Sequence, residues 1–354
     1  MTSIHDLPTE TIAQILSLIH TPSSFEQPHL PRCKGDDTPH IKFNESLRDL
    51  QHATRVSKLW LDLGQPMLWR HLNIWSYNGA RLVNNCPALG RFRTEELNIL
   101  IGEDAEWDQR DWRKDFPPLI KGVKGLKKLV MVGNRSINGD WVTEESLKDL
   151  KTLNLNVIIH PLHSTPPANF QLSTLEIGGY VSDPSFITSV FTSSSHTLTS
   201  LKIDPIRIHH PTLLKAFPLI QNSLQHLDIV GELKGIDKVL PNLKVLASAR
   251  FSFSIDSDNF FHFLTTALGA LPDCTKTVAL SLQDPLPEMM TDILCVVRYS
   301  LRAVKDWERL TVVECGCCGD DGRRGQKSVS DLEGWGDLLV VCEEKGVSVT
   351  IDEH

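Results

Sequence analysis

The sequence lacks any apolar run long enough to cross a bilayer. A membrane-spanning helix needs about 20 consecutive apolar residues, whereas the run from Ile293 to Val297 has only five. The first six residues, Met-Thr-Ser-Ile-His-Asp, have neither the basic start nor the apolar stretch of a secretory signal. We therefore expect an intracellular protein that is cytoplasmic, nuclear or both and has no membrane partner.

An excess of positive charge is also missing. The chain has 36 Lys and Arg against 44 Asp and Glu, which gives a formal net charge of −8. A protein that binds nucleic acid without regard to sequence needs cations to neutralise the phosphates. The charge balance therefore argues against a nucleic-acid partner. The eight cysteines of a chain expected inside the cell are better explained as free thiols than as a disulfide framework.

Familiar catalytic motifs are absent: there is no Gly-x-Ser-x-Gly elbow, no phosphate-binding Gly-x-x-x-x-Gly-Lys loop and no His-Glu-x-x-His helix. The strongest candidate for chemistry is the thiol group of Cys315, Cys317 and Cys318. A tetrahedral zinc site needs further ligands, and only Cys342 lies at a plausible spacing. A Gly-rich loop explains the three thiols better. We expect no metal, no cofactor and no catalytic residue, and keep a thiol or metal enzyme as an alternative.

Two fragments near the N-terminus have helical periodicity. Pro8 suits the first position of a helix, and apolar residues follow it at i, i+3, i+4 and i+7 spacing from Ile12 to Ile19. The same spacing recurs from Val56 to Leu63. Short helices with one apolar face are stable only when packed on each other or on a partner. The spacing therefore predicts a small helical module.

The order of motifs in these fragments resembles the F-box, a module that binds an adaptor protein. The motifs are Leu-Pro-x-Glu at 7–10, Val-Ser-Lys-x-Trp at 56–60 and Pro-x-Leu-Trp at 66–69. The chain departs from the family where residues 21–43, rich in Pro and His, intervene as a predicted surface loop. The residues that match the pattern, as adaptor contacts or as module core, are Leu7, Pro8, Ile12, Leu16, Val56, Trp60, Leu68 and Trp69.

A second phrase recurs from residue 69 onward: an apolar residue, two others, Leu, one other and an apolar residue. The middle leucines Leu129, Leu153, Leu175, Leu201 and Leu227 are 24, 22, 26 and 26 residues apart. This period is similar to that of leucine-rich repeats, whose units stack into a parallel sheet because none covers its own apolar face. The expected ladder Asn appears only as Asn134, so the array is irregular. Later copies at Leu243/Leu246, Leu280/Leu282, Leu310/Val312 and Val349/Ile351 are looser.

Together the two parts resemble fungal-type F-box proteins with degenerate leucine-rich repeats. The resemblance implies an α/β chain: a small all-α module over 1–70, then an irregular solenoid with a curved parallel sheet over 71–354. It further implies a non-catalytic substrate receptor of a Skp–cullin–F-box ubiquitin ligase, which binds a Skp-type adaptor, through it a cullin, and an unknown protein substrate. A repeat scaffold without any ubiquitin ligase role is the alternative.

Substrate binding is expected on the strand-lined concave face of the array. Side chains that flank the inward apolar residues of each strand belong to that face, and they carry both charge signs. We select Glu176, Lys202 and Asp228 as candidates. Trp107 and Trp112, in an acidic segment that lengthens one repeat, are alternative contacts because aromatic residues are favoured interface anchors. Burial of both rings at the end of the array is an equally good explanation.

Overall fold

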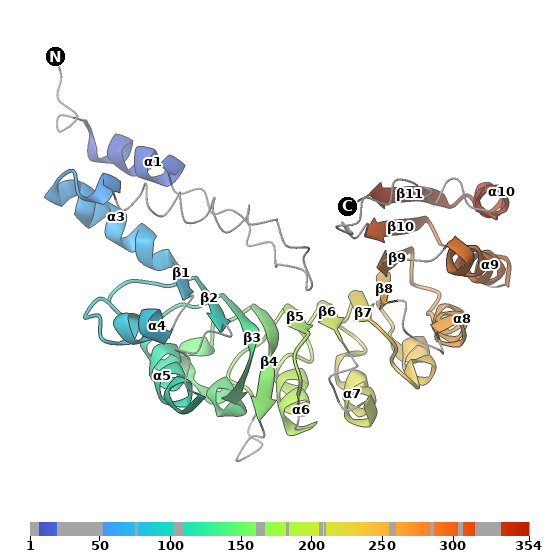
Figure 1. Cartoon of the computed structure of the whole chain (residues 1–354), viewed down its shortest axis with the longest axis horizontal. Coiled ribbons are helices and arrows are strands. Elements are labelled where there is room, and N and C mark those ends of the chain that lie inside the picture. Colours follow the sequence, from blue (N-terminus) through green and yellow to red (C-terminus); the bar gives the residue numbers. More distant parts are fainter. Residues whose placement is uncertain are drawn as a thin grey trace.

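The computed structural model describes residues 7–19, 52–74, 77–101, 109–160, 167–181, 184–204, 208, 210–254, 260–283, 287–303, 307–315 and 334–353. One curved parallel sheet dominates the molecule, and its strands follow each other in chain order (Figure 1). The strands are β1 (His71–Ile74), β2 (Glu96–Ile101), β3 (Lys128–Asn138), β4 (Thr152–His160), β5 (Thr174–Ile177), β6 (Ser200–Ile203), β7 (His226–Val230), β8 (Ser248–Ser254), β9 (Thr277–Gln283), β10 (Arg309–Cys315) and β11 (Ser348–Glu353).

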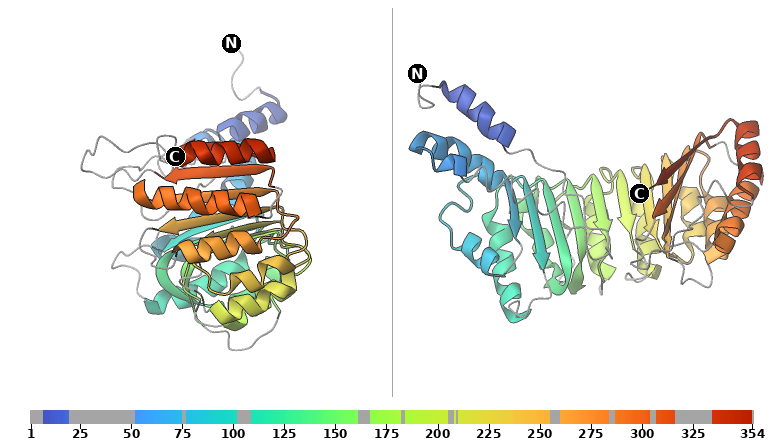
Figure 2. Two further views of the ribbon diagram at one scale, coloured as in Figure 1. Left: turned by 90° about the vertical axis from the view of Figure 1, so that its right-hand side faces the viewer. Right: turned by 45° about the horizontal axis from the view of Figure 1, so that its top comes forward.

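In the described part of the chain, the helices that follow the strands lie on the convex side of this sheet, which is clearest in Figure 1 and in the right-hand view of Figure 2. The α-helices that follow the strands are α4 (Tyr77–Asn84), α5 (Gln109–Gly122), α6 (Pro184–Ser193), α7 (His210–Ala216), α8 (Phe260–Ala270), α9 (Pro287–Ala303) and α10 (Trp335–Lys345). Short 3-10 turns take this place elsewhere: η2 (Gly139–Thr143), η3 (Glu145–Leu147), η5 (Phe217–Ile220), η6 (Ile236–Lys238) and η7 (Leu240–Asn242). Two further helices, α1 (Thr9–Ile19) and α3 (Lys58–Arg70), precede the sheet.

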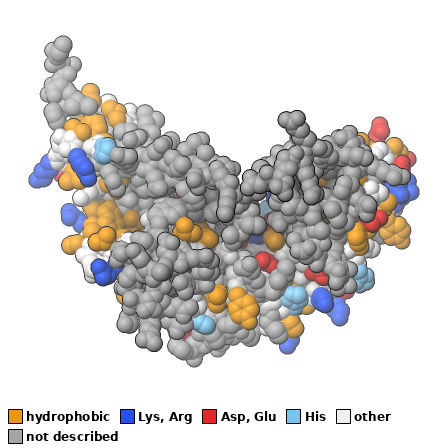
Figure 3. Space-filling view, in the orientation of Figure 1, with side chains coloured by type: hydrophobic (Ala, Val, Ile, Leu, Met, Phe, Trp, Pro, Cys, Tyr) orange, Lys and Arg blue, Asp and Glu red, His pale blue; other side chains and the backbone are white. Residues whose placement is uncertain are grey.

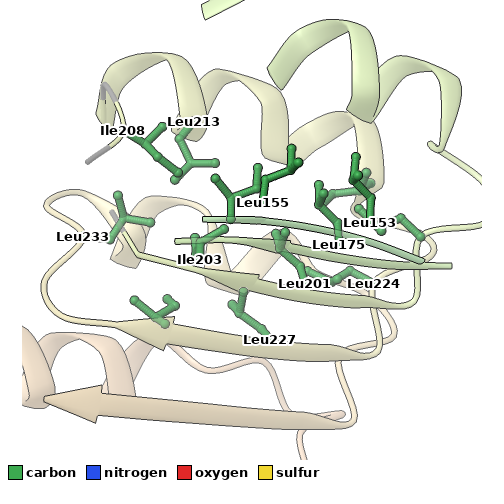
Figure 4. Close-up of a cluster of buried hydrophobic side chains, with 14 of the residues drawn as sticks. Leu153, Leu155, Leu175, Leu201, Ile203, Ile208, Leu213, Leu224, Leu227 and Leu233 are labelled. Carbon is green, nitrogen blue, oxygen red and sulfur yellow. The ribbon is translucent and has the colours of Figure 1, made fainter. Parts of the chain in front are cut away.

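Leucines in register hold the array together. Leu129, Leu153, Leu175, Leu201 and Leu227 are paired strand to strand, and each is at most 2% exposed. Figure 4 shows such side chains pointing from the strands into the space below the helices. Burying one leucine contributes about 1.5–3 kcal/mol. The repeated apolar phrase therefore forms one continuous core along the sheet.

Aromatic rings connect neighbouring units within this core. Trp141 packs edge-on against Phe116, with ring centroids 5.9 Å apart, and also touches Phe186 at 6.3 Å. Phe191 and Phe217 form another edge-to-face pair, at 6.4 Å. Rings in this geometry favour each other electrostatically beyond the area that they bury. They fill the irregular gaps between units of unequal length.

The parallel, solenoid-like α/β architecture expected from the sequence is confirmed. The apolar positions expected for β1 to β7, and also those for β10 and β11, are strand residues that face the helices. Gly346 ends α10 in a left-handed conformation with φ 69°, as its sequence position predicts. Among the described residues, no helix is both long and apolar enough to cross a membrane.

Of two later units, one was predicted at the wrong place and the other in the right strand but the wrong register. The copy at Leu243 and Leu246 is not a strand: both residues are buried between η7 and β8, and β8 itself aligns Ala249 and Phe251 with Leu227 and Ile229. In β9 the paired residues are Val278 and Leu280, which places the unit two residues before the predicted Leu280 and Leu282. A search for leucine misses both units because Ala, Phe and Val fill the inward positions equally well.

Gly179 gives a test of how tightly adjacent units pack. A Cβ atom at this buried position would lie 2.0 Å from the backbone oxygen of Val157 on β4, too close for any contact. We predict that Gly179→Ala lowers the free energy of unfolding by about 1–3 kcal/mol, because the backbone must move. Chemical denaturation of the full chain measures this change.

Gly269 provides the matched control for that substitution. It lies in α8, and a Cβ atom there meets nothing within 4 Å. Gly269→Ala should leave stability unchanged or raise it by up to about 1 kcal/mol, because Ala favours helix over Gly. Equal effects of the two substitutions would contradict the close approach at Gly179.

Candidate functional site

The first candidate surface lies on the paired helices α1 and α3. Ile12 and Leu16 of α1 are fully buried, and Trp60 of α3 is 4% exposed against them. Ser57 caps α3 by accepting a hydrogen bond from the backbone N–H of Trp60 at 3.3 Å, which is the usual way to satisfy a free helix donor. The pair therefore has a small apolar core of its own, separate from that of the sheet.

A tight contact at α3 holds the residue Thr54 against this helix. Gly64 of α3 is buried, and a Cβ atom there would lie 2.3 Å from the Cγ2 methyl of Thr54, whereas the 3.8 Å distance to a Leu16 methyl of α1 is an ordinary contact. A larger residue at Gly64 would therefore displace the Thr54 side chain. The motif comparison did not select this glycine.

The structure sorts the sequence candidates on this module. Ile12, Leu16 and Trp60 are core. The others are only partly covered or exposed, so they remain available to a partner: Leu7, Leu68 and Trp69 are half-buried, Pro8 is exposed and Val56 is 47% exposed. Leu59 and Leu61 are also exposed, at 41% and 37%, and sequence reasoning missed them. Figure 3 shows hydrophobic and basic side chains close together at this end of the molecule.

The second candidate surface is the concave face of the sheet. Its central row runs through Asn73, Asn98, Val130, Asn154, Glu176, Lys202, Asp228 and Arg250, one residue from each of β1 to β8. The candidates Glu176, Lys202 and Asp228 are therefore consecutive neighbours. Arg250 extends the row, and the sequence prediction missed it because β8 was placed too early.

Charges alternate along the second half of this row. The Lys202 ammonium lies 2.8 Å from a Glu176 carboxylate oxygen, and the Asn154 amide donates to the other oxygen at 2.7 Å. Burial raises the pKa of Asp228, although Lys202 and Arg250 on either side act to lower it. Each charge is thus shared between neighbours, and the row resembles a polar protein surface more than an apolar ligand pocket.

Several polar atoms in the row have no hydrogen-bond partner among the described residues. They are the amide nitrogen of Asn73, the amide oxygens of Asn98 and Asn154, whose residues are 5% and 7% exposed, and the Nε of Arg250. A buried polar atom without a partner costs about 1–3 kcal/mol. A bound polypeptide with complementary donors and acceptors would recover this cost.

The remaining sequence candidates lie outside what the structure describes. Trp107 falls between the described ranges, and of Trp112 only the backbone, in α5, is described. The same holds for the thiol group: Cys315 ends β10, and Cys317 and Cys318 follow it outside the described residues. Cys342 is buried, and this burial raises the pKa of its thiol, which disfavours the reactive thiolate.

Comparisons with known proteins do not assign the chain to a family. No protein-family model and no curated protein matches it. Within the described ranges, no three His, Cys, Asp or Glu side chains gather as ligands for a metal ion. A function for the chain can therefore be inferred from the helix pair, the sheet and the chemistry of their surfaces.

Glu96 yields a prediction about pH at the first edge of the concave face. Its carboxylate bonds to His71 at 3.3 Å and Lys128 at 2.8 Å. Burial alone would raise its pKa, but the hydrogen bonds from His71 and Lys128 outweigh this and lower the pKa of Glu96 to about 2. A lowered folded-state pKa means that ionised Glu96 stabilises the fold above its unfolded pKa of about 4.3.

We predict that Glu96→Gln destabilises the protein at pH 7 by on the order of 3 kcal/mol. The difference from the unmodified chain should shrink as pH falls from about 4.5 towards 2, because both chains are then uncharged at this position. Urea midpoints at pH 7 and pH 3 measure it. Glu343→Gln, on the exposed face of α10, is the control and should have little effect. A pH-independent loss at Glu96 would contradict the ionic explanation.

Proposed function

We propose that this chain is the substrate receptor of a Skp–cullin–F-box ubiquitin ligase. The observation that carries the proposal is the helix pair α1/α3, which has its own core of Ile12, Leu16 and Trp60 and leaves Val56 and Leu59 exposed. Exposed apolar side chains on a small polar-rimmed module are typical of a protein-binding site. The order of motifs over these helices resembles an F-box. This resemblance is the reason for proposing a Skp-type adaptor as the partner.

The array supplies the second half of the proposed function. Helix α3 ends at Arg70 and β1 begins at His71, so no flexible linker separates the helix pair from the sheet. A receptor built in this way performs no chemistry. It holds a substrate lysine near the ubiquitin carrier and thereby raises the effective concentration of the two reactants. With this role we expect the chain in the cytoplasm, the nucleus or both.

The central row of the concave face is the proposed substrate site. Its alternating charges from Glu176 to Arg250 and the unpaired amide oxygens of Asn98 and Asn154 favour a polar polypeptide as ligand. Electrostatic complementarity of this kind contributes specificity and fast association more than affinity. The alternative function, a repeat scaffold outside any ubiquitin ligase, would use the same row but would not need the exposed residues of α3.

Adaptor binding tests the proposal directly. We predict that the full-length double variant Val56→Glu/Leu59→Glu binds a purified Skp-type adaptor at least about tenfold more weakly, because burying two charges in an apolar interface costs more than 1.4 kcal/mol. Titration calorimetry measures this affinity. Leu82→Glu/Tyr299→Glu changes two other exposed apolar residues, at 71% and 70%, and should bind normally. No adaptor binding by the unmodified chain would favour the scaffold function.

Substrate binding is tested by reversing the charges of three residues in the central row. Glu176→Lys/Lys202→Glu/Asp228→Lys should deplete a subset of co-purified proteins by about tenfold, because several charge pairs become repulsive together, and should leave adaptor affinity unchanged. The control Glu343→Lys/Lys345→Glu/Glu344→Lys makes the same net charge change on exposed positions of α10. Quantitative mass spectrometry compares the three chains. An unchanged set of partners would move the substrate site to the loops, where Trp107 and Trp112 are next.

A further inference from the structure

Basic side chains gather at the edge of the sheet where the first strands begin. We call this group the strand-start patch, and its members are Arg70, Arg91, Arg93, Lys124, Lys127 and Lys151. All six are exposed. They share a position in the repeat: Arg70 ends α3 before β1, and the others precede β2, β3 and β4. Because parallel strands start at the same edge of a sheet, residues about one repeat apart become neighbours.

Contacts in the structure join five of the six members, and Arg91 precedes Arg93 by two residues in the chain. The Glu95 carboxylate lies 3.0 Å from Arg70, 3.3 Å from Lys127 and 4.0 Å from Arg93. The backbone N–H of Lys151 donates to the carbonyl of Lys127 at 2.8 Å. Lys124 is joined through its carbonyl, which accepts from the N–H of Thr94, next to Arg93. The patch therefore extends across the starts of β1, β2, β3 and β4.

Within the described ranges, the positive charge of this patch is balanced only in part. Glu95 is the one acid there whose carboxylate lies within ion-pair distance of patch members, and three cations share it. Burial would raise the pKa of Glu95, but the hydrogen bonds from Arg70 and Lys127 hold it below its ordinary value. Arg70, Arg93 and Lys127 remain 56%, 57% and 49% exposed at their side chains. Asp149 is a further exposed acid, close to Lys151 in the chain.

Such a patch is unexpected on a chain with net charge −8. Like charges that lie within the Debye length of about 8 Å at physiological salt repel one another. This repulsion is relieved when an acidic partner binds, and the local field also accelerates the encounter with that partner. Stability of the fold alone gives no reason to collect these side chains at one edge.

We propose that the strand-start patch binds an acidic segment of a partner protein, rich in Asp and Glu. The patch lies at the edge of the sheet and not on its concave face, so this site is separate from the proposed substrate row. Carboxylates of this segment would pair with the three cations that do not contact Glu95: Arg91, Lys124 and Lys151. The Lys151 ammonium donates a hydrogen bond to the Gln171 carbonyl at 3.4 Å and has further donors for a carboxylate.

The observations favour an acidic polypeptide over a nucleic acid. Nucleic acid would extend beyond six cations onto a protein whose remaining charge is strongly negative, and its phosphates would be repelled there. Phe92, an aromatic residue within the patch, is half-buried and has one face covered by the Arg91 guanidinium at 5.4 Å, so it is poorly placed to stack on a base. A short acidic segment matches the area and charge of the patch without these costs.

Fluorescence anisotropy of the full chain with a labelled Asp/Glu-rich peptide tests the proposal. The triple variant Arg91→Gln/Lys124→Gln/Lys151→Gln removes three charges without taking a partner from Glu95. We expect about tenfold weaker binding of the peptide, because three exposed ion pairs of modest strength are lost together, and a further decrease with added salt. A peptide with Asn and Gln in place of Asp and Glu should not bind.

The matched control is Lys215→Gln/Lys238→Gln/Lys244→Gln, which removes the same charge from exposed lysines around α7, η6 and η7. It should bind the acidic peptide like the unmodified chain. Circular dichroism melting verifies that both triple variants are folded. An equal loss in both would show a bulk charge effect and overturn the proposal. Absence of saturable peptide binding would also overturn it, as would tighter, patch-dependent binding of a duplex DNA probe.

Discussion

The structure depends on one constraint: a single strand with its helix cannot cover its own apolar face. Leu153 is fully buried only because Leu129 and Leu175 lie beside it in register and because a helix or 3-10 turn closes the space behind them. Burial of each inward residue therefore requires its neighbours. This dependence fixes the strand order, the parallel direction and the one-sided helix layer, and it leaves the concave face and the sheet edges free for other purposes.

The same register that buries leucines also assembles charge. Residues one repeat apart become lateral neighbours about 4.8 Å apart, so a charge pattern spread over 75 residues becomes a compact row from Glu176 to Arg250. At the strand starts it brings Arg93, Lys127 and Lys151 together. Neither surface is visible in the composition, because a net charge of −8 gives no sign of a local basic patch.

Sequence alone predicted most of the fold because the inward positions of most units are chemically alike. It failed at β8 and β9, where Ala249 and Val278 take the place of leucine and the helix-side space is filled differently, here with Phe251 against Phe263. The helix pair was anticipated from Ile12, Leu16 and Trp60, but periodicity could not separate core from surface. Val56 fits the same apolar pattern and is exposed, because it precedes the Ser57 cap and lies outside the helix.

The junction between α3 and β1 fixes the helix pair, which is the proposed adaptor site, relative to the sheet, which carries the proposed substrate site. Arg70, the last residue of α3, accepts a hydrogen bond at its carbonyl from the N–H of Glu95 at 2.8 Å, and its guanidinium lies 3.0 Å from the Glu95 carboxylate. The exposed ion pair alone adds little stability. The backbone bond, however, continues the pairing of β1 with β2 into the end of α3. A receptor that acts by proximity needs such a fixed junction, because freedom there would dilute the effective concentration that it is proposed to create.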